Sequence, residues 1–188
     1  MEKIPTIFER DWEGDRSRVL NQPVPECDWV FEGFGVPTRK YDGTCVMFDG
    51  HAWWARREIK EGKSPPPNFV FLSHDDQTMK TVGWEPIDQS PFYKYWIEAM
   101  DNRRAVPEAG DFFAGTHELI GPKINGNPEC APNHVLIPHA LANEVMCPTR
   151  TFEAIRAVLE GRPIEGIVFH NADGRMGKVK KRDFGLKR

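Results

Sequence analysis

The sequence predicts an α+β fold in which a mostly antiparallel sheet assembly is accompanied by a few helices. Two hairpin signals carry this prediction. Asp49-Gly50 separates two runs of strand-forming residues, and its preference for positive φ suits a tight turn. Residues 171–174 separate two further apolar runs in the same manner. By contrast, residues 151–160 place their apolar side chains on one helical face and end at Gly161, which predicts the clearest helix.

The expected elements follow from local composition. Residues 1–28 are polar and proline-spotted and predict a short N-terminal arm, so the folded domain is expected over residues 29–188. Residues 60–68 contain consecutive prolines, which deny a sheet its backbone donors, and residues 120–132 are rich in glycine, proline and asparagine; both predict loops. Strands are expected at Trp29–Gly35, Thr44–Phe48, Ala52–Arg57, Asp111–Ile120, Ile164–His170 and Met176–Lys181, and helices at Pro91–Met100 and Thr151–Glu160.

Composition is that of an ordinary globular protein. Of the 188 residues, 39% are hydrophobic and 28% are charged, a balance expected for one domain with a sizeable core. No apolar run approaches the roughly 18 residues that a membrane span requires, and the N-terminus lacks the apolar segment of a secretory signal. We therefore expect a cytoplasmic protein with no membrane partner. The 4 cysteines lie far apart without metal-like spacing, which favours buried free thiols over a disulfide or zinc role.

Basic residues are concentrated near the end of the sequence. The net charge of −3 excludes a generally basic nucleic-acid coat. Within residues 174–188, however, Asp183 is the single acidic residue. The basic residues in this range are Arg175, Lys178, Lys180, Lys181, Arg182, Lys187 and Arg188. This composition fits either a solvated basic tail or a surface that binds phosphates. The motifs described next favour the phosphate-binding alternative.

Four short motifs carry residue types that suit phosphate chemistry. They are Lys40-Tyr-Asp-Gly43 on a turn, Glu118 in a β-rich segment, Glu165-Gly166 at the start of an apolar strand, and Lys178-Val-Lys180. Alone, the first motif fits an exposed hairpin, and each of the other three fits strand-edge charge. In the last motif, alternation places both lysines on one strand face and Val179 toward the core. The combination and order of the motifs indicate a function.

Attack of a lysine amine on the α-phosphorus of ATP explains why these residue types belong together. The amine must be neutral, whereas the reference pKa of lysine is about 10.4. Nearby cations and partial burial disfavour the ammonium and so activate the nucleophile. Two lysines on one strand face supply that field and also hold the negative oxygens of the transition state. Two carboxylates can bind a divalent metal, for which Mg²⁺ (or Mn²⁺) is expected because it prefers oxygen ligands and bridges phosphates.

The motifs resemble those of the covalent nucleotidyltransferase superfamily, which contains ATP-dependent DNA and RNA ligases and mRNA capping enzymes. In that superfamily a KxxG motif with the nucleophile is followed by an arginine, a glutamate motif, an EG-hydrophobic motif and a KxK motif. Here they read Lys40-Tyr-Asp-Gly43, Arg56-Arg57, Glu118, Glu165-Gly166 and Lys178-Val-Lys180. The resemblance spans most of the chain, and the strings GTHELIGPKINGNP and EGIVFHN are most similar to small RNA ligases with a bare catalytic domain.

The resemblance implies a role for each matching residue. Lys40 would take the AMP, while Lys178 and Lys180 would grip the α-phosphate. The implied catalytic residues are therefore Lys40, Lys178 and Lys180. The implied nucleotide-binding residues are Lys40, Asp42, Gly43, Arg57, Glu118, Ile167, Lys178 and Lys180, with Glu118 and Glu165 as the metal ligands.

Several assignments have alternatives. Arg56 replaces Arg57 if the opposite strand face points inward, and Val168 is the alternative to Ile167 in lining the adenine pocket. The family usually stacks an aromatic on the base, and only Phe152 lies in the expected interval, within a predicted core helix. His117 and Asn125 are candidates for contact with an RNA 2′-hydroxyl. The spacing of His134 and His139 permits a metal pair, although histidines of a loop and a strand edge fit better.

The resemblance implies an ATP-dependent RNA ligase that forms lysyl-AMP, transfers AMP to a 5′-phosphate and joins that end to a 3′-hydroxyl. Its partners would be RNA ends, with no obligatory protein partner evident. Few residues follow Lys181, so the expected fold is a nucleotidyltransferase domain without an OB-fold, in contrast to DNA ligases and capping enzymes. The alternatives are a minimal DNA ligase, a GTP-using guanylyltransferase, and a non-catalytic nucleic-acid-binding module.

Overall fold

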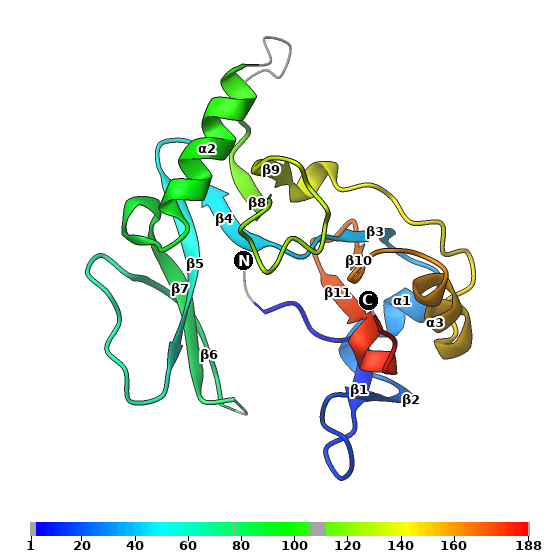
Figure 1. Cartoon of the computed structure of the whole chain (residues 1–188). Coiled ribbons are helices and arrows are strands. Elements are labelled where there is room, and N and C mark those ends of the chain that lie inside the picture. The colour runs from blue at the N-terminus through cyan, green and yellow to red at the C-terminus, as the bar shows by residue number, and fades with distance from the viewer. Residues whose placement is uncertain (1–2, 77, 106–111, 188) are drawn as a thin grey trace. The chain divides into compact units, whose positions relative to one another are not determined.

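The computed structural model describes residues 3–76, 78–105 and 112–187, and Figure 1 labels its elements. The chain divides into two compact units. The first unit comprises Met1–Lys3 and Asp42–Leu141, and the second comprises Ile4–Tyr41 and Ala142–Arg188. The chain therefore passes from one unit to the other between Tyr41 and Asp42, inside the Lys40-Tyr-Asp-Gly43 motif.

The first unit is built on an antiparallel sheet of six strands in the order β6-β7-β5-β4-β8-β9. The Asp49-Gly50 turn joins two central strands: Gly50 has φ +100°, and Asp49 Oδ1 accepts hydrogen bonds of 2.8 Å from the backbone N–H groups of His51 and Ala52. The strands are β4 (Thr44–Phe48), β5 (Trp53–Lys60), β6 (Val70–Asp75), β7 (Lys80–Pro86), β8 (Gly115–Ile120) and β9 (Val135–Pro138).

Helix α2 (Tyr93–Arg104) packs on one face of this sheet. Side chains of Val46, Ala55 and Leu119 are buried there in one apolar cluster with Ala99 of the helix. The cross-strand pairs Val46–Ala55 and Thr44–Leu119 place them on the same side of the sheet, because directly paired residues share a face. We call this side the helix-covered face. The opposite side, which carries Glu118, is called the Glu118 face.

The second unit contains a three-stranded antiparallel sheet in the order β11-β10-β3 and a separate β1-β2 pair. Its strands are β1 (Phe8–Arg10), β2 (Val19–Pro23), β3 (Val36–Lys40), β10 (Gly166–His170) and β11 (Met176–Lys180). Its helices are α1 (Asp28–Phe31), α3 (Phe152–Glu160) and the short 3₁₀ turns η1 (Pro25–Cys27) and η5 (Lys181–Phe184).

Both outer strands of the three-stranded sheet have a backbone neighbour. On the β11 side, Lys178 donates its N–H to Pro5 O at 2.9 Å and accepts from Ile7 N–H at 3.0 Å. On the β3 side, Arg39 donates its N–H to Asn143 O at 2.7 Å, and Val145 donates to Pro37 O at 2.8 Å. Irregular segments therefore cover both edges of the sheet.

The core of the second unit lies between α3, the sheet and the first strands of the chain. Ile155 and Leu159 of α3 and Ile167 of β10 are fully buried in one cluster. The Phe152 ring packs edge-on against Phe8 at 5.0 Å and against Phe184 at 4.8 Å. Phe152 is therefore a core residue, as its helical position predicted, and the aromatic that would stack on a base stays unassigned.

Most of the predicted elements are confirmed. The sheet-rich, antiparallel α+β architecture, both predicted helices and the strands on either side of the two hairpin turns are present. Thr151 caps α3 by accepting the Ala154 N–H at 3.3 Å. The strand expected from residue 111 begins at Gly115, and residue 111 itself lies outside the described residues.

Two expectations need correction. Residues 29–35 were expected to form a strand, but Asp28–Phe31 form helix α1, which buries Trp29 and Val30 on one turn. The chain then bends through Gly33 and Gly35 at φ +94° and +80°, and β3 begins at Val36. Residues 1–28, expected to form an arm, contain β1 and β2 and contribute the buried side chains of Ile7 and Phe8.

The cysteines are free thiols, as their spacing predicted, but only Cys27 and Cys147 are buried; Cys45 is partly exposed and Cys130 is exposed. Within the three ranges that the structure describes, no helix has the length and hydropathy of a membrane span.

Candidate active site

Three lysines lie on one face of the three-stranded sheet in the second unit. Gly166 of β10 pairs with Lys40 of β3 on one side and with Lys180 of β11 on the other. Two residues further along, Val168 pairs with Lys178. Since paired residues share a face, Lys40, Lys178 and Lys180 project on the same side. Val179 between the two β11 lysines is fully buried, which confirms the predicted register of this strand.

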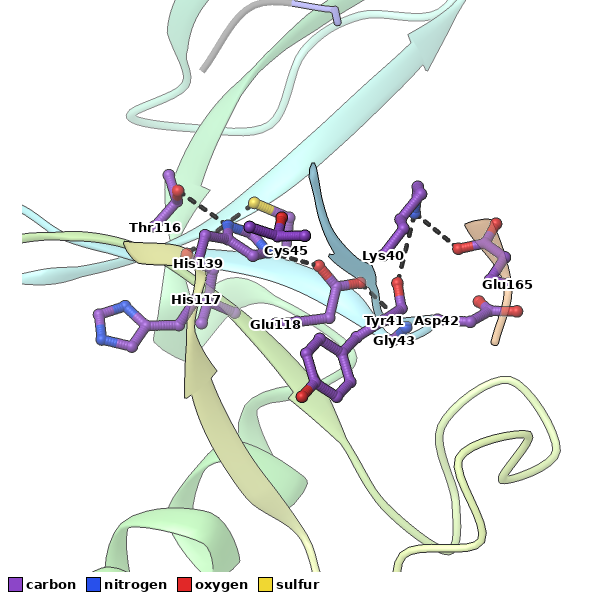
Figure 2. Close-up of polar contacts among 12 residues, drawn as sticks. Lys40, Tyr41, Asp42, Gly43, Cys45, Thr116, His117, Glu118, His139 and Glu165 are labelled. Carbon is purple, nitrogen blue, oxygen red and sulfur yellow. Dashed lines mark hydrogen bonds and ion pairs between the residues drawn. The ribbon is translucent and has the colours of Figure 1, made fainter. Parts of the chain in front are cut away.

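Glu165 forms the centre of this lysine cluster. Its Oε2 lies 2.6 Å from Lys40 Nζ, and its Oε1 lies 2.6 Å from Lys180 Nζ (the contact with Lys40 is drawn in Figure 2). The side chain of Lys40 is 21% exposed, that of Lys180 is 17% exposed and that of Glu165 is 14% exposed. All three are therefore largely shielded from solvent. Charge-assisted hydrogen bonds of this length fix the lysine nitrogens relative to each other.

The sequence next to β10 and β11 explains why the cluster can form. At Gly166, an added Cβ would lie 2.3 Å from Val179 O, so only glycine allows β11 to approach here. The Lys180 N–H is donated to Asp183 Oδ2 at 2.8 Å, and the other Asp183 oxygen accepts from Arg10 Nη2 at 3.2 Å. Asp183 is buried, and it therefore ties the end of β11 to the first strand of the unit.

The first unit carries a second carboxylate, Glu118 on β8. Its Oε1 accepts the Gly43 N–H at 2.9 Å, and its Oε2 lies 2.9 Å from His139 Nε2 (Figure 2). A Cβ on Gly43 would lie 2.2 Å from Leu119 O, so the glycine permits this approach of the turn to β8. The side chain of Glu118 is 11% exposed.

The loop between β8 and β9 holds the turn from another side. Asn125 Nδ2 donates to Asp42 Oδ1 at 2.9 Å and to Gly43 O at 2.8 Å. Glu129 Oε1 accepts the Asp42 N–H at 2.9 Å. Asn125 itself adopts φ +48°, a left-handed conformation that asparagine tolerates better than most residues. Asp42 and Gly43 are therefore fixed by hydrogen bonds to three side chains of the first unit.

The strand register decides between the two arginines. Cys45 pairs with Glu118, Met47 pairs with Trp54, and Arg56 follows Trp54 by two residues. Arg56 therefore lies on the Glu118 face. Arg57 lies on the helix-covered face, where its Nε is 3.7 Å from Oε2 of the buried Glu85. Arg56, the alternative to Arg57, is therefore the arginine that shares a face with Glu118.

We expect the two arginines to differ in what they support. Arg56→Ala should slow covalent attachment of a nucleotide about 10- to 100-fold, the loss typical of a hydrogen bond to a charged group. Arg57→Ala should instead lower the melting temperature, because Glu85, whose pKa is raised by burial, loses the cation that offsets this effect. Melting curves and rates of adduct formation on both variants test this, and a larger rate loss for Arg57→Ala would reverse the assignment.

Other predicted residues occupy less favourable places. Ile167 is fully buried on the side of β10 that faces the core, whereas its alternative, Val168, shares a face with the lysines. His117 is 1% exposed and packs 5.1 Å from Trp53 on the helix-covered face. Burial lowers its pKa to about 4, and Nδ1 donates to Gly115 O at 3.1 Å. His117 is therefore a core residue and unsuited to contact RNA.

His134 and His139 serve different partners. His134 Nδ1 lies 2.6 Å from Glu98 Oε2, and His139 Nε2 lies 2.9 Å from Glu118 Oε2. The sequence raised His139 only as part of a possible metal pair with His134 and gave no sign of its contact with Glu118, and it did not single out Glu129. Their positions depend on where the β8–β9 loop and the turn after β9 lie in the folded chain, and no short motif predicts that.

Within the described parts of the chain, there is no cluster of three or more His, Cys, Asp or Glu side chains that could hold a metal ion.

The separate carboxylates suit Mg²⁺ in one respect. This ion commonly takes one or two carboxylates and completes its shell with water and substrate phosphates. Glu118 and Glu165 each present carboxylate oxygens, which is the donor type that it prefers. The lysine cluster around Glu165 in the second unit is therefore a candidate phosphate-binding site.

Comparisons with known proteins point to a particular kind of enzyme. Residues 102–188 match the family model described as RNA ligase 1. RNA ligase 1 of Danio rerio is 27% identical over 210 residues, covering 91% of this chain and 61% of the relative. RNA ligase 1 of Pongo abelii and that of Rattus norvegicus are each 38% identical over 163 residues, covering 71% of this chain and 47% of each relative. The chain is thus similar to RNA ligases and spans about half to three fifths of their length.

Proposed function

We propose that this chain carries the adenylyltransferase activity of an ATP-dependent RNA ligase and that Lys40 accepts the AMP. The observation that carries the proposal is the Lys40–Glu165–Lys180 cluster, in which a shielded lysine lies beside a carboxylate and a second lysine. The similarity to RNA ligase 1 proteins supports RNA as the substrate.

The first step forms a bond between Lys40 Nζ and the α-phosphorus of ATP and breaks the bond to the β-phosphate, so that pyrophosphate leaves. The Lys40 nitrogen must lose its proton before it attacks, and Glu165 Oε2 at 2.6 Å is positioned to accept it. Lys180 and Lys178 would stabilise the negative charge that develops on the phosphate oxygens. Glu165 would hold Mg²⁺, which would supply positive charge to neutralise the phosphates. Glu118, in the other unit, would bind either a metal ion or the ribose.

Two further steps complete the proposed reaction. In the second, a 5′-phosphate oxygen of RNA attacks the lysyl-AMP phosphorus, the P–N bond breaks and the Lys40 amine is restored. In the third, a 3′-hydroxyl attacks the activated 5′-phosphate, forming a phosphodiester bond and releasing AMP. Arg56 is the candidate on the Glu118 face for binding a phosphate or ribose in these steps.

The nucleotide and polynucleotide specificities are tested together. We expect labelled ATP to transfer label to the chain and labelled GTP to transfer little. We also expect faster joining of 5′-phosphorylated RNA ends than of matched DNA ends, single-stranded or nicked, at fixed salt. The basic residues 175–188 would hold the phosphates, so joining should weaken steeply as salt rises.

Other outcomes identify the alternatives. Equal or faster joining of all-DNA ends would overturn RNA as the preferred substrate while keeping the lysyl-AMP chemistry. Transfer of GMP would make it a guanylyltransferase. Binding of RNA without any covalent nucleotide would make it a non-catalytic nucleic-acid-binding module.

A further inference from the structure

A histidine outside the recognised motifs contacts Glu118 directly. His139 is the first residue of the 3₁₀ turn η4 (His139–Leu141), immediately after β9. Its Nε2 lies 2.9 Å from Glu118 Oε2, and its Nδ1 lies 2.9 Å from Thr116 Oγ1 (Figure 2). Thr116 and Glu118 are two residues apart on β8 and therefore share the Glu118 face. The imidazole thus spans two side chains of one strand.

The chemistry of the three groups sets the direction of the hydrogen bonds. An ionised carboxylate can only accept, so His139 Nε2 carries a proton and donates it to Glu118. In the neutral ring Nδ1 then accepts, and the Thr116 hydroxyl donates to it. The chain of donors runs from Thr116 through His139 to Glu118. Such a chain fixes both the tautomer and the orientation of the ring.

Glu118 is consequently held at both oxygens. The Gly43 N–H occupies one position on Oε1, and His139 occupies one on Oε2. A carboxylate offers about four lone-pair positions, so about two remain for a substrate hydroxyl or a metal ion. With its side chain 11% exposed and two donors fixing its plane, Glu118 is oriented before any ligand arrives.

We infer that His139 is a positioning residue for Glu118, with Thr116 orienting the imidazole, and that this triad sets the strength of nucleotide binding at the Glu118 face. The inference rests on the proposed function, since Glu118 is there assigned to the ribose or the metal. Groups that orient a ligating carboxylate typically change metal affinity or activity 10- to 100-fold when removed. His139 acts through Glu118 and has no assigned contact with the nucleotide.

The competing explanation is that His139 only attaches η4 to β8. Three substitutions separate these two roles. His139→Gln places an amide N–H near the position of Nε2 and keeps the donor to Glu118. His139→Asn places its amide near Nδ1 and loses that donor, and His139→Ala loses both. If the role of His139 is purely structural, the loss of activity in the three variants should follow their decrease in melting temperature and should not depend on where the amide donor lies.

The experiment measures ATP binding and adduct formation separately. Titration calorimetry with ATP and Mg²⁺ is done in a Lys40→Arg background, where no adduct can form, and adduct rates are measured with Lys40 present. We expect His139→Ala and His139→Asn to weaken binding or slow adenylation about 10- to 100-fold. His139→Gln should retain most of both. In a Glu118→Ala background, His139→Ala should have little further effect, because its route of action is gone.

His74 provides a matched control in the same unit. Its Nδ1 also lies 2.9 Å from a threonine hydroxyl, that of Thr81, but its Nε2 is 3.7 Å from the exposed Asp76. His74→Ala should leave both readouts unchanged.

The possible failures are distinguishable. If the wild-type chain forms no AMP adduct and binds no ATP, the proposed function fails and takes this inference with it. If the wild type does both while His139→Ala equals it, only the positioning role is overturned. Equal losses in the Gln and Ala variants, or additive losses with Glu118→Ala, also overturn it.

Discussion

Replacement of Lys40 by alanine should abolish the covalent AMP adduct. Lys40 is the lysine of the turn motif, and its nitrogen is held at 2.6 Å from Glu165. Lys40→Arg should abolish the adduct as well, although it keeps a cation beside Glu165, because a guanidinium is not deprotonated in proteins and cannot act as a nucleophile. Intact-mass analysis after incubation with ATP and Mg²⁺ should show one added AMP on the wild type and none on either variant.

Lys80 is a suitable control for this experiment. It also lies at the end of a strand and pairs with a glutamate, Glu58, at 2.7 Å, but on β7 of the first unit. Lys80→Ala should leave the adduct intact. An adduct of undiminished yield on Lys40→Ala would show that another lysine is the nucleophile.

Substitution of Glu165 should produce the second largest loss. Its two oxygens hold both Lys40 and Lys180, so Glu165→Ala removes the common partner of two largely shielded lysines. Misplacement of a reacting group by about 1 Å can cost about 100-fold in rate, and we expect at least this loss in adduct formation. Glu58→Ala, which removes an exposed glutamate from a single lysine, should have little effect on the same rate.

The Mg²⁺ dependence separates two roles of Glu165. If the residue binds metal, raising Mg²⁺ should partly restore the Glu165→Ala rate, because a missing ligand weakens affinity without removing the other ligands. If it acts only on the lysines, Mg²⁺ should not restore the rate. Full activity of Glu165→Ala and Glu118→Ala without added metal would exclude metal binding by these carboxylates.

Patterns confined to one segment could be interpreted from the sequence. The two hairpins, the apolar face of α3 and the alternation Lys178-Val179-Lys180 all depend on residues close in the chain, and each is present. The grouping of Lys40, Glu165 and Lys180 was expected from the resemblance alone. Their separations in sequence are large, and the structure shows that strand pairing through Gly166 brings them together.

Features that depend on register or packing escaped sequence reasoning. Alternation showed that Arg56 and Arg57 point in opposite directions, but only the pairing of β5 with β4, and of β4 with β8, shows which one accompanies Glu118. His117 lies between Thr116 and Glu118 in the sequence, yet it faces the core because successive strand residues point to opposite faces. The sequence predicts a strand where helix α1 forms, because the apolar run of α1 is too short to show a helical period.

The backbone neighbours of the three-stranded sheet have a consequence for handling the protein. Strand β11 carries Lys178 and Lys180, and the outward N–H and C=O groups of Lys178 are bonded to the backbone of Pro5 and Ile7. Without residues 5–7, this strand would become a sheet edge able to pair with another chain. A shortened version lacking them would be prone to self-association, and it would lose activity even though every proposed catalytic residue was still present.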